Sequence, residues 1–307
     1  MKMTVGFIGV GTIGAPMARN IRKAGFPLVV CDSNAAATEA FARSGARAMS
    51  RPSEVAAACD LVITMLPDSP DVEAVATGPG GIASGIRPGR IYMDMSTIDP
   101  GTTRRIAATI RAAGARMVDA PVARAVEDAE KGTLAIMIGG EADDVAEVRP
   151  VLEVMGNCIV HAGPLGNGHA LKLVNNYVSA GILALHAEAL AFGMKAGLSL
   201  EKIVELVGST GAASAHLLKI QPAKSFVGDF RRGFMTKLAA KDVRLALAMA
   251  KDAGVGTPVG LGLQAALRET CGKGYDTDDI SSVVRLREDE AGVKIRYAGR
   301  NMQASET

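Results

Sequence analysis

The stretch VGFIGVGTIGAPMARNI, residues 5–21, contains the pattern G-x-G-x-x-G at Gly9, Gly11 and Gly14. The apolar run before the first glycine is typical of a short buried strand, and the residues after the third glycine have helical spacing. In such a turn the first glycine permits the sharp bend, the second lets the backbone approach a pyrophosphate, and the third lets helix and strand pack closely. An isolated match is also compatible with an ordinary strand–helix turn, so the surrounding sequence must distinguish that turn from a nucleotide-binding one.

The next apolar run, LVVCD at 28–32, ends in Asp32, eighteen residues after Gly14. A carboxylate at this point accepts hydrogen bonds from the adenosine ribose hydroxyls and repels a 2′-phosphate. Ser33 and Asn34 follow, without an arginine that would favour NADP(H). The sequence therefore predicts NAD(H) as cofactor. The predicted contacts from this region are Gly9, Gly11, Thr12, Ile13, Gly14 and Asp32.

Short β-type runs alternate with helical segments up to Gly163, and only helical patterns follow, the longest over 168–195. This order predicts an α/β fold, a Rossmann-type doubly wound and mostly parallel sheet followed by an all-helical C-terminal domain. The predicted domains are 1–164 for NAD binding and 165–307 for substrate binding and oligomerisation. The charged tail from about 288 is expected to be loose at its end. The predicted strands are 4–9, 28–32, 60–66, 90–96, 115–121, 134–140 and 157–163.

Composition excludes several classes of function. The formal net charge is +2 and only 11 residues are Phe or Tyr, so no basic, aromatic-rich surface for nucleic acid is expected. The four cysteines have no C-x-x-C pair and the histidines no ligand-like spacing, which predicts neither disulfides nor a metal site. Polar residues interrupt the apolar stretch 170–194, which argues against a membrane span, and no signal-peptide pattern opens the chain. We expect a cytoplasmic protein.

Seven stretches, in order along nearly the whole chain, resemble the β-hydroxyacid dehydrogenases, a family that includes 3-hydroxyisobutyrate dehydrogenase and tartronate semialdehyde reductase. The resemblance implies NAD(P)-linked oxidation of a short 3-hydroxy acid, or the reverse reduction of its semialdehyde, in a cleft between the two domains. The matching stretches are FIGVGTIGAPMARNI (7–21), TMLPD (64–68), DMSTIDP (94–100), DAPV (119–122), GTLAIMIGG (132–140), GHALKLVNNY (168–177) and FMTKLAAKD (234–242).

Lys172, Asn176 and Ser179 share one face of a helix by their spacing. Within GHALKLVNNY, Lys172 matches the family's catalytic lysine, which implies a general acid for aldehyde reduction and a general base for alcohol oxidation. Taken alone, a lysine on an amphipathic helix is more often solvated. The resemblance implies that Asn176, the second catalytic residue, hydrogen-bonds the substrate oxygens, with Asn175 as a helper in substrate binding.

The resemblance also implies roles for residues at strand ends and in a later helix. Lys241 is expected to approach the nicotinamide end of the cofactor, the alternative being a surface pair with Lys237 or another neighbour. Ser96 is expected to bind the substrate and Thr97 the cofactor, unless both belong to a simple strand-end turn. The residues expected along the adenosine and pyrophosphate side are Met65, Leu66 and Pro67.

The chain departs from the family pattern at DAPVARAVEDA, 119–129, where most members of the family read DAPVSGG. Ala123 stands in place of the substrate-binding serine, and Arg124 in place of the first glycine. A guanidinium can grip an oxyanion through two hydrogen bonds, so Arg124 is a candidate clamp for the substrate anion, unless it turns to solvent. The sulfolactaldehyde reductase branch also carries an arginine here, but the small polar residues that follow it there are Ala125 and Val126 in this chain.

The predicted function is NAD-dependent oxidation of a 3-hydroxyisobutyrate-like acid or reduction of its semialdehyde, with 3-sulfolactaldehyde, tartronate semialdehyde and succinic semialdehyde as alternative substrates. A non-catalytic nucleotide-binding protein is the alternative from another class, and the presence of Lys172 argues against it. Imine reductases share the architecture but generally lack this lysine. The expected partner is a small anionic hydroxy acid or semialdehyde. The long apolar helix predicts a homodimer or homotetramer.

Overall fold

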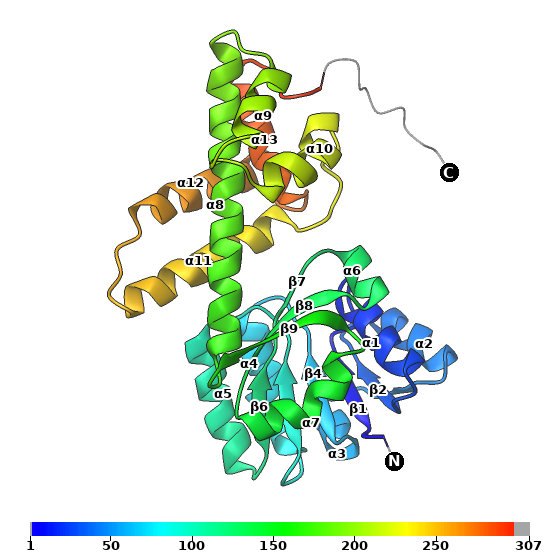
Figure 1. Cartoon of the computed structure of the whole chain (residues 1–307). Coiled ribbons are helices and arrows are strands. Elements are labelled where there is room, and N and C mark those ends of the chain that lie inside the picture. Colours follow the sequence, from blue (N-terminus) through cyan, green and yellow to red (C-terminus); the bar gives the residue numbers. More distant parts are fainter. Residues whose placement is uncertain (1, 298–307) are drawn as a thin grey trace. The chain divides into compact units, whose positions relative to one another are not determined.

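A computed structural model describes residues 2–297 of the chain (Figure 1). The chain divides into two compact units, residues 1–173 and residues 174–307. All named strands lie in the first unit, and the described part of the second unit is built from helices and turns. Each unit has a hydrophobic core of its own.

The sheet of the first unit begins with six parallel strands in the order β3-β2-β1-β4-β5-β6, and β8 continues it antiparallel to β6. β7 pairs antiparallel with β8, and β9 pairs parallel with it. This confirms the mostly parallel, doubly wound sheet. The strand order reverses between β1 and β4, where such sheets bind nucleotides beyond the carboxyl ends of their strands. The strands are β1 (Val5–Ile8), β2 (Leu28–Cys31), β3 (Arg47–Ala48), β4 (Leu61–Thr64), β5 (Ile91–Asp94), β6 (Arg116–Asp119), β7 (Val122–Ala123), β8 (Leu134–Gly139) and β9 (Gly156–Gly163).

Helices cover both faces of this sheet because its central strands are apolar on both sides. Successive strand residues point to opposite faces, so Phe7 enters one core and Ile8 the other. The first core is closed by helices that include α1 (Gly14–Lys23), α2 (Ala35–Arg43), α6 (Val126–Lys131) and α7 (Ala142–Leu152). The second core is closed by α3 (Pro52–Ala58), α4 (Ser69–Thr77) and α5 (Pro100–Ala112).

The second unit is organised around α8 (Asn167–Lys195), a 29-residue helix that begins in the first unit and continues into the second. Its residues Leu183 and Leu190 are buried in the core of the second unit. The predicted all-helical character is confirmed for the described residues, and α13 continues past position 288, where we expected the polar tail to begin. The end of that tail lies outside the described residues. The other helices are α9 (Leu200–Gly208), α10 (Gln221–Ala223), α11 (Thr236–Asp252), α12 (Pro258–Thr270) and α13 (Val283–Ala291).

Short 3₁₀ and π turns complete the described chain, at Ile82–Ser84, His216–Ile220, Ser225–Val227, Cys271–Tyr275 and Ile280–Ser282. Among the described residues, α8 is the one helix long and apolar enough to cross a membrane by length and composition. A core helix of a soluble protein meets the same criteria, and α8 contributes many side chains to the core of the second unit.

Gly14 and Gly11 provide a matched pair that tests the packing of α1 on the turn after β1. A Cβ at Gly14 would lie 1.9 Å from the carbonyl oxygen of Gly9, whereas one at Gly11 meets nothing within 4 Å. We expect Gly14→Ala to lower the midpoint of thermal unfolding by roughly 2–10 °C, because that carbonyl must shift. Gly11→Ala should leave the midpoint nearly unchanged in the absence of cofactor. Equal midpoints for the two variants would contradict the close contact.

Candidate functional site

The loop after β1 packs tightly on one side and is open on the other. Gly9 has φ +96°, a conformation that glycine adopts without strain, and a Cβ there would lie 2.4 Å from the carbonyl oxygen of Met65. Gly11 faces open space. Helix α1, which begins at Gly14, has no side-chain cap and no acidic residue in its first turn. An uncapped helix N-terminus behind an open glycine backbone fits a pyrophosphate.

Asp32 follows β2 and is tied to the glycine loop. Its carboxylate accepts the backbone N–H of Val10 at 2.7 Å and that of Asn34 at 2.8 Å. Each carboxylate oxygen has a further lone pair, so Asp32 can still accept ribose hydroxyls. The first unit thus brings together the predicted NAD contacts of the glycine loop and Asp32. The side chain of Leu66 lies beside this loop, 3.0 Å from where a Cβ on Gly9 would stand.

The ends of β4 and β5 are joined through Ser96. Ser96 is fully buried, and its hydroxyl oxygen accepts the N–H of Leu66 at 2.9 Å. Its own N–H donates to Asp94 at 3.1 Å. Ser96 therefore holds the two loops together, with Thr97 half-buried beside it and Pro67 exposed.

Sequence reasoning missed a polar cluster at the carboxyl ends of β5 and β6, formed by Asp94, Thr103, Asp119 and His169, all fully buried. Burial raises the pKa of Asp119, an effect that His169 and two backbone N–H groups oppose. The available signal was the pair of aspartates that lie two residues before the ends of two predicted strands, in DMS and DAP. His169 lies three residues before Lys172, whose exposure is only 8 %.

A second polar network connects α8 with α11 inside the second unit. Asn176 donates from its side-chain nitrogen to Asp242 at 2.6 Å, and Asn175 donates to the side-chain oxygen of Asn176 at 3.0 Å. The ammonium group of Lys241 lies 3.0 Å from the other oxygen of Asp242, and its side chain is only 10 % exposed. Asp242, to which the sequence analysis assigned no role, is thus the centre of the network.

Arg124 lies on an exposed turn of the first unit, directly after the half-buried Ala123. Its φ is +87°, the one positive value for a non-glycine residue among those described. The guanidinium donates to the carbonyl oxygen of Thr133 and, at 2.8 Å, to the side-chain oxygen of Asn157. Both acceptors are neutral, and no carboxylate within residues 2–297 pairs with this charge.

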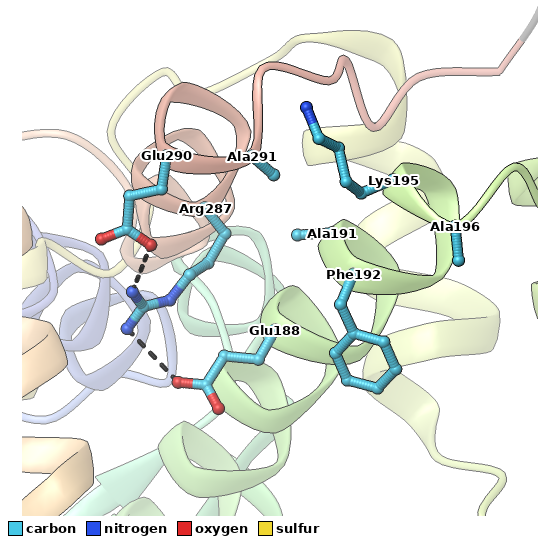
Figure 2. A pocket seen from close by; sticks show the side chains of 8 residues that line it. All are labelled: Glu188, Ala191, Phe192, Lys195, Ala196, Arg287, Glu290 and Ala291. Carbon is cyan, nitrogen blue, oxygen red and sulfur yellow. Dashed lines mark hydrogen bonds and ion pairs between the residues drawn. The ribbon is translucent and has the colours of Figure 1, made fainter.

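A hollow of about 500 Å³ lies in the second unit, between the C-terminal half of α8 and α13 (Figure 2). Arg287 crosses it, 3.3 Å from Glu188 and 2.6 Å from Glu290, and Phe192 lies at its rim. Its lining contains none of the predicted site residues. Across the part of the chain that the structure describes, no group of three or more His, Cys, Asp or Glu side chains could hold a metal ion.

Comparison with known proteins assigns both parts of the chain. Residues 4–163 match the NAD binding domain of 6-phosphogluconate dehydrogenase, and residues 166–287 match the NAD-binding domain of NADP-dependent 3-hydroxyisobutyrate dehydrogenase. The chain is 36 % identical to 2-(hydroxymethyl)glutarate dehydrogenase of Eubacterium barkeri, covering 96 % of this chain and 98 % of the relative. It is 34 % identical to 3-sulfolactaldehyde reductase of Escherichia coli K12, covering 94 % and 97 %.

The structure is similar to that of 3-hydroxyisobutyrate dehydrogenase from Mycobacterium tuberculosis with L-serine, with a TM-score of 0.86 at 30 % identity over 93 % of this chain and 99 % of that one. The sequence similarity and the structural similarity both extend over nearly the full length of this chain and of these relatives. The glycine loop and Asp32 lie in the first of the two matched ranges, and Lys172 lies in the second. The chain therefore belongs to the β-hydroxyacid dehydrogenase family, as an NAD-dependent oxidoreductase of small hydroxy acids.

Proposed function

We propose that this enzyme oxidises the primary alcohol of a small 3-hydroxy acid, or reduces the matching semialdehyde, with Lys172 as the acid–base group. One observation carries the assignment of roles: a lysine only 8 % exposed precedes the buried Asn176 by one helical turn on α8. Burying an ammonium group costs free energy unless it is paired and hydrogen-bonded, so lysine is an unusual residue at a buried position. The two side chains share one helix face, as a proton carrier and an oxygen-binding amide require.

In the oxidising direction, the neutral amine of Lys172 takes the proton of the substrate hydroxyl as the carbon–oxygen double bond forms. Bound NAD supplies the acceptor for the hydride that leaves the same carbon. In the reducing direction, the Lys172 ammonium returns the proton to the developing alkoxide. Asn176, held by Asp242, presents its amide in a fixed orientation and so can align the substrate oxygen.

The relatives narrow the class of substrate. Their names specify 3-hydroxyisobutyrate and 2-(hydroxymethyl)glutarate, and one from Pseudomonas aeruginosa is named NAD-dependent L-serine dehydrogenase. In these compounds a CH₂OH group and a carboxylate are attached to the same carbon. The E. coli relative is named for 3-sulfolactaldehyde, which has a sulfonate instead. We propose that the substrate has an oxidisable CH₂OH carbon, or its aldehyde, and one nearby anionic group.

Arg124 is the proposed clamp for that anion, and Ser96 and Ala123 are proposed to lie near it. The guanidinium is exposed, and its neutral acceptors leave its charge uncompensated by any carboxylate among the described residues. Its left-handed backbone costs about 1–3 kcal/mol in a non-glycine residue, a cost that a binding role would explain.

We further propose that residues 1–164 form the NAD-binding domain and residues 165–307 the domain for substrate binding and oligomerisation. The cytoplasm is the proposed location.

We also propose a homodimer or homotetramer formed through α8. Five of its apolar side chains are 36–69 % exposed, and they recur at spacings of three, four and seven residues. This is the heptad spacing of a helix that packs against another helix, and a second copy offers the same row. The row consists of Leu171, Val174, Val178, Leu185 and Phe192.

The role of Lys172 is tested by Lys172→Ala. We expect kcat to fall about 10²–10⁴-fold because the proton has no carrier, while NADH still binds. Stopped-flow turnover and NADH fluorescence titration measure the two quantities. Lys195→Ala, an exposed lysine near the end of the same helix, is the matched control and should behave as wild type. Near-normal turnover of Lys172→Ala would remove the lysine from the mechanism.

The role of Arg124 is tested with methylmalonate, tartronate and succinic semialdehydes and with 3-sulfolactaldehyde. We expect one substrate to dominate and Arg124→Ala to lower its kcat/KM roughly 10–100-fold, the effect of losing a charge-assisted hydrogen bond. Arg124→Gly, which removes the charge and also relieves the backbone, should lose as much activity. If both variants keep wild-type kcat/KM, the anion is bound elsewhere.

The assembly is tested by Leu185→Glu, which places a charge in the middle of the exposed row on α8. We expect the wild type to sediment as a dimer or tetramer and the variant as a smaller species. Leu206→Glu, an equally exposed leucine on α9, is the control. A monomeric wild type, or an assembly disrupted by Leu206→Glu and not by Leu185→Glu, would contradict the proposal.

A further inference from the structure

The buried polar cluster of the first unit lies one helical turn before Lys172. His169, in the first turn of α8, is fully buried with Asp94 and Asp119 on either side: its ring nitrogens lie 3.6 and 3.5 Å from the two carboxylates. Desolvating two carboxylates costs several kcal/mol per ion, so their hydrogen bonds must be well placed to offset that cost. The groups that donate these hydrogen bonds show which parts of the chain the cluster orders.

Asp119 fixes where α8 begins. One of its oxygens accepts the N–H of Gly166 and the other that of His169, both at 2.6 Å. A carboxylate in this place satisfies backbone donors that a helix leaves unpaired, and it interacts favourably with the helix dipole. The fit is close, since a Cβ at Gly168 would lie 2.4 Å from the carbonyl oxygen of Met137.

The ring of His169 fixes how this first turn is rotated. Nε2 lies 3.1 Å from the carbonyl oxygen of Ser96, and Nδ1 lies 2.8 Å from the hydroxyl of Thr103 on α5. A carbonyl oxygen only accepts, so Nε2 carries a proton and donates it to Ser96. Ser96 in turn accepts the N–H of Leu66. One imidazole thus ties the start of α8 to the loops after β4 and β5.

Lys172 follows His169 by three residues, so the two side chains are neighbours on one face, about 4.5 Å apart along the helix axis. We propose that His169 is a positioning residue for Lys172: its two hydrogen bonds orient the turn from which the ammonium group reaches the reacting oxygen. This inference rests on the proposed acid–base role of Lys172. A displacement of about 1 Å is enough to slow a reaction 10²-fold.

Three variants of His169 distinguish the roles of its two ring nitrogens. A glutamine amide reaches the place of Nε2, an asparagine amide reaches that of Nδ1, and alanine reaches neither. We expect His169→Ala to lower kcat about 10–100-fold while the Kd for NADH stays within about twofold. His169→Gln should recover most of the loss, because it can still donate to Ser96, and His169→Asn should recover less.

The isotope effect on kcat separates positioning from a loss of folded enzyme. With NADH deuterated at C4, the isotope effect on kcat should rise in His169→Ala, since a misplaced proton donor slows the chemical step. A smaller folded fraction would lower kcat without changing the isotope effect. Thr77→Val, which removes a side-chain hydrogen bond to Glu73 within α4, is the control and should leave kcat and isotope effect unchanged.

The outcomes distinguish this proposal from the one it rests on. Near-normal turnover of Lys172→Ala overturns the acid–base role itself. A slow Lys172→Ala with wild-type kcat in both His169→Gln and His169→Asn overturns positioning through the ring nitrogens, even if His169→Ala does not fold. A slow His169→Ala with an unchanged isotope effect also overturns it. Slow chemistry with retained NADH binding, rescued by glutamine more than by asparagine, supports it.

Discussion

The carboxylate of Asp119 at the start of α8 is the interaction on which most of the site depends. It is fully buried and accepts two backbone N–H groups at 2.6 Å. β6 holds Asp119 at the carboxyl edge of the sheet, so the first turn of a 29-residue helix is held at that edge as well. This contact therefore also constrains the position of Lys172, because a helix is rigid over a single turn.

Helix α8 presents three different surfaces along its length. Lys172, Asn176 and Ser179 form a polar row, and Leu183 and Leu190 enter the core of the second unit. A third, apolar row that includes Leu185 is exposed. Because α8 carries both a core face and an exposed apolar row, it is apolar around most of its circumference. This explains why its composition resembles that of a membrane-spanning segment.

Within each unit, aspartates hold candidate site residues by the same means. Asp32 accepts two backbone N–H groups beside the glycine loop, Asp119 accepts two at α8, and Asp242 binds Asn176 and Lys241. A carboxylate has two oxygens and can therefore fix two donors at once, which offsets the cost of its own desolvation. Side chains held in this way are oriented before a ligand arrives, which favours fast chemistry.

The sequence by itself determined the alternation of the main strands and helices along the chain, the turn at Gly9 and Gly14, the aspartate that follows β2, and the lysine of α8. Each depends on periodicity or on residues close in the chain, where local geometry decides. Only the tertiary structure decided which groups hold these residues. The hydrogen-bond partners of Asp119 and His169 in the cluster are 47 to 73 residues away, and Arg124 binds Asn157 across 33 residues. Such pairs arise from strand order and close packing, which no local pattern records.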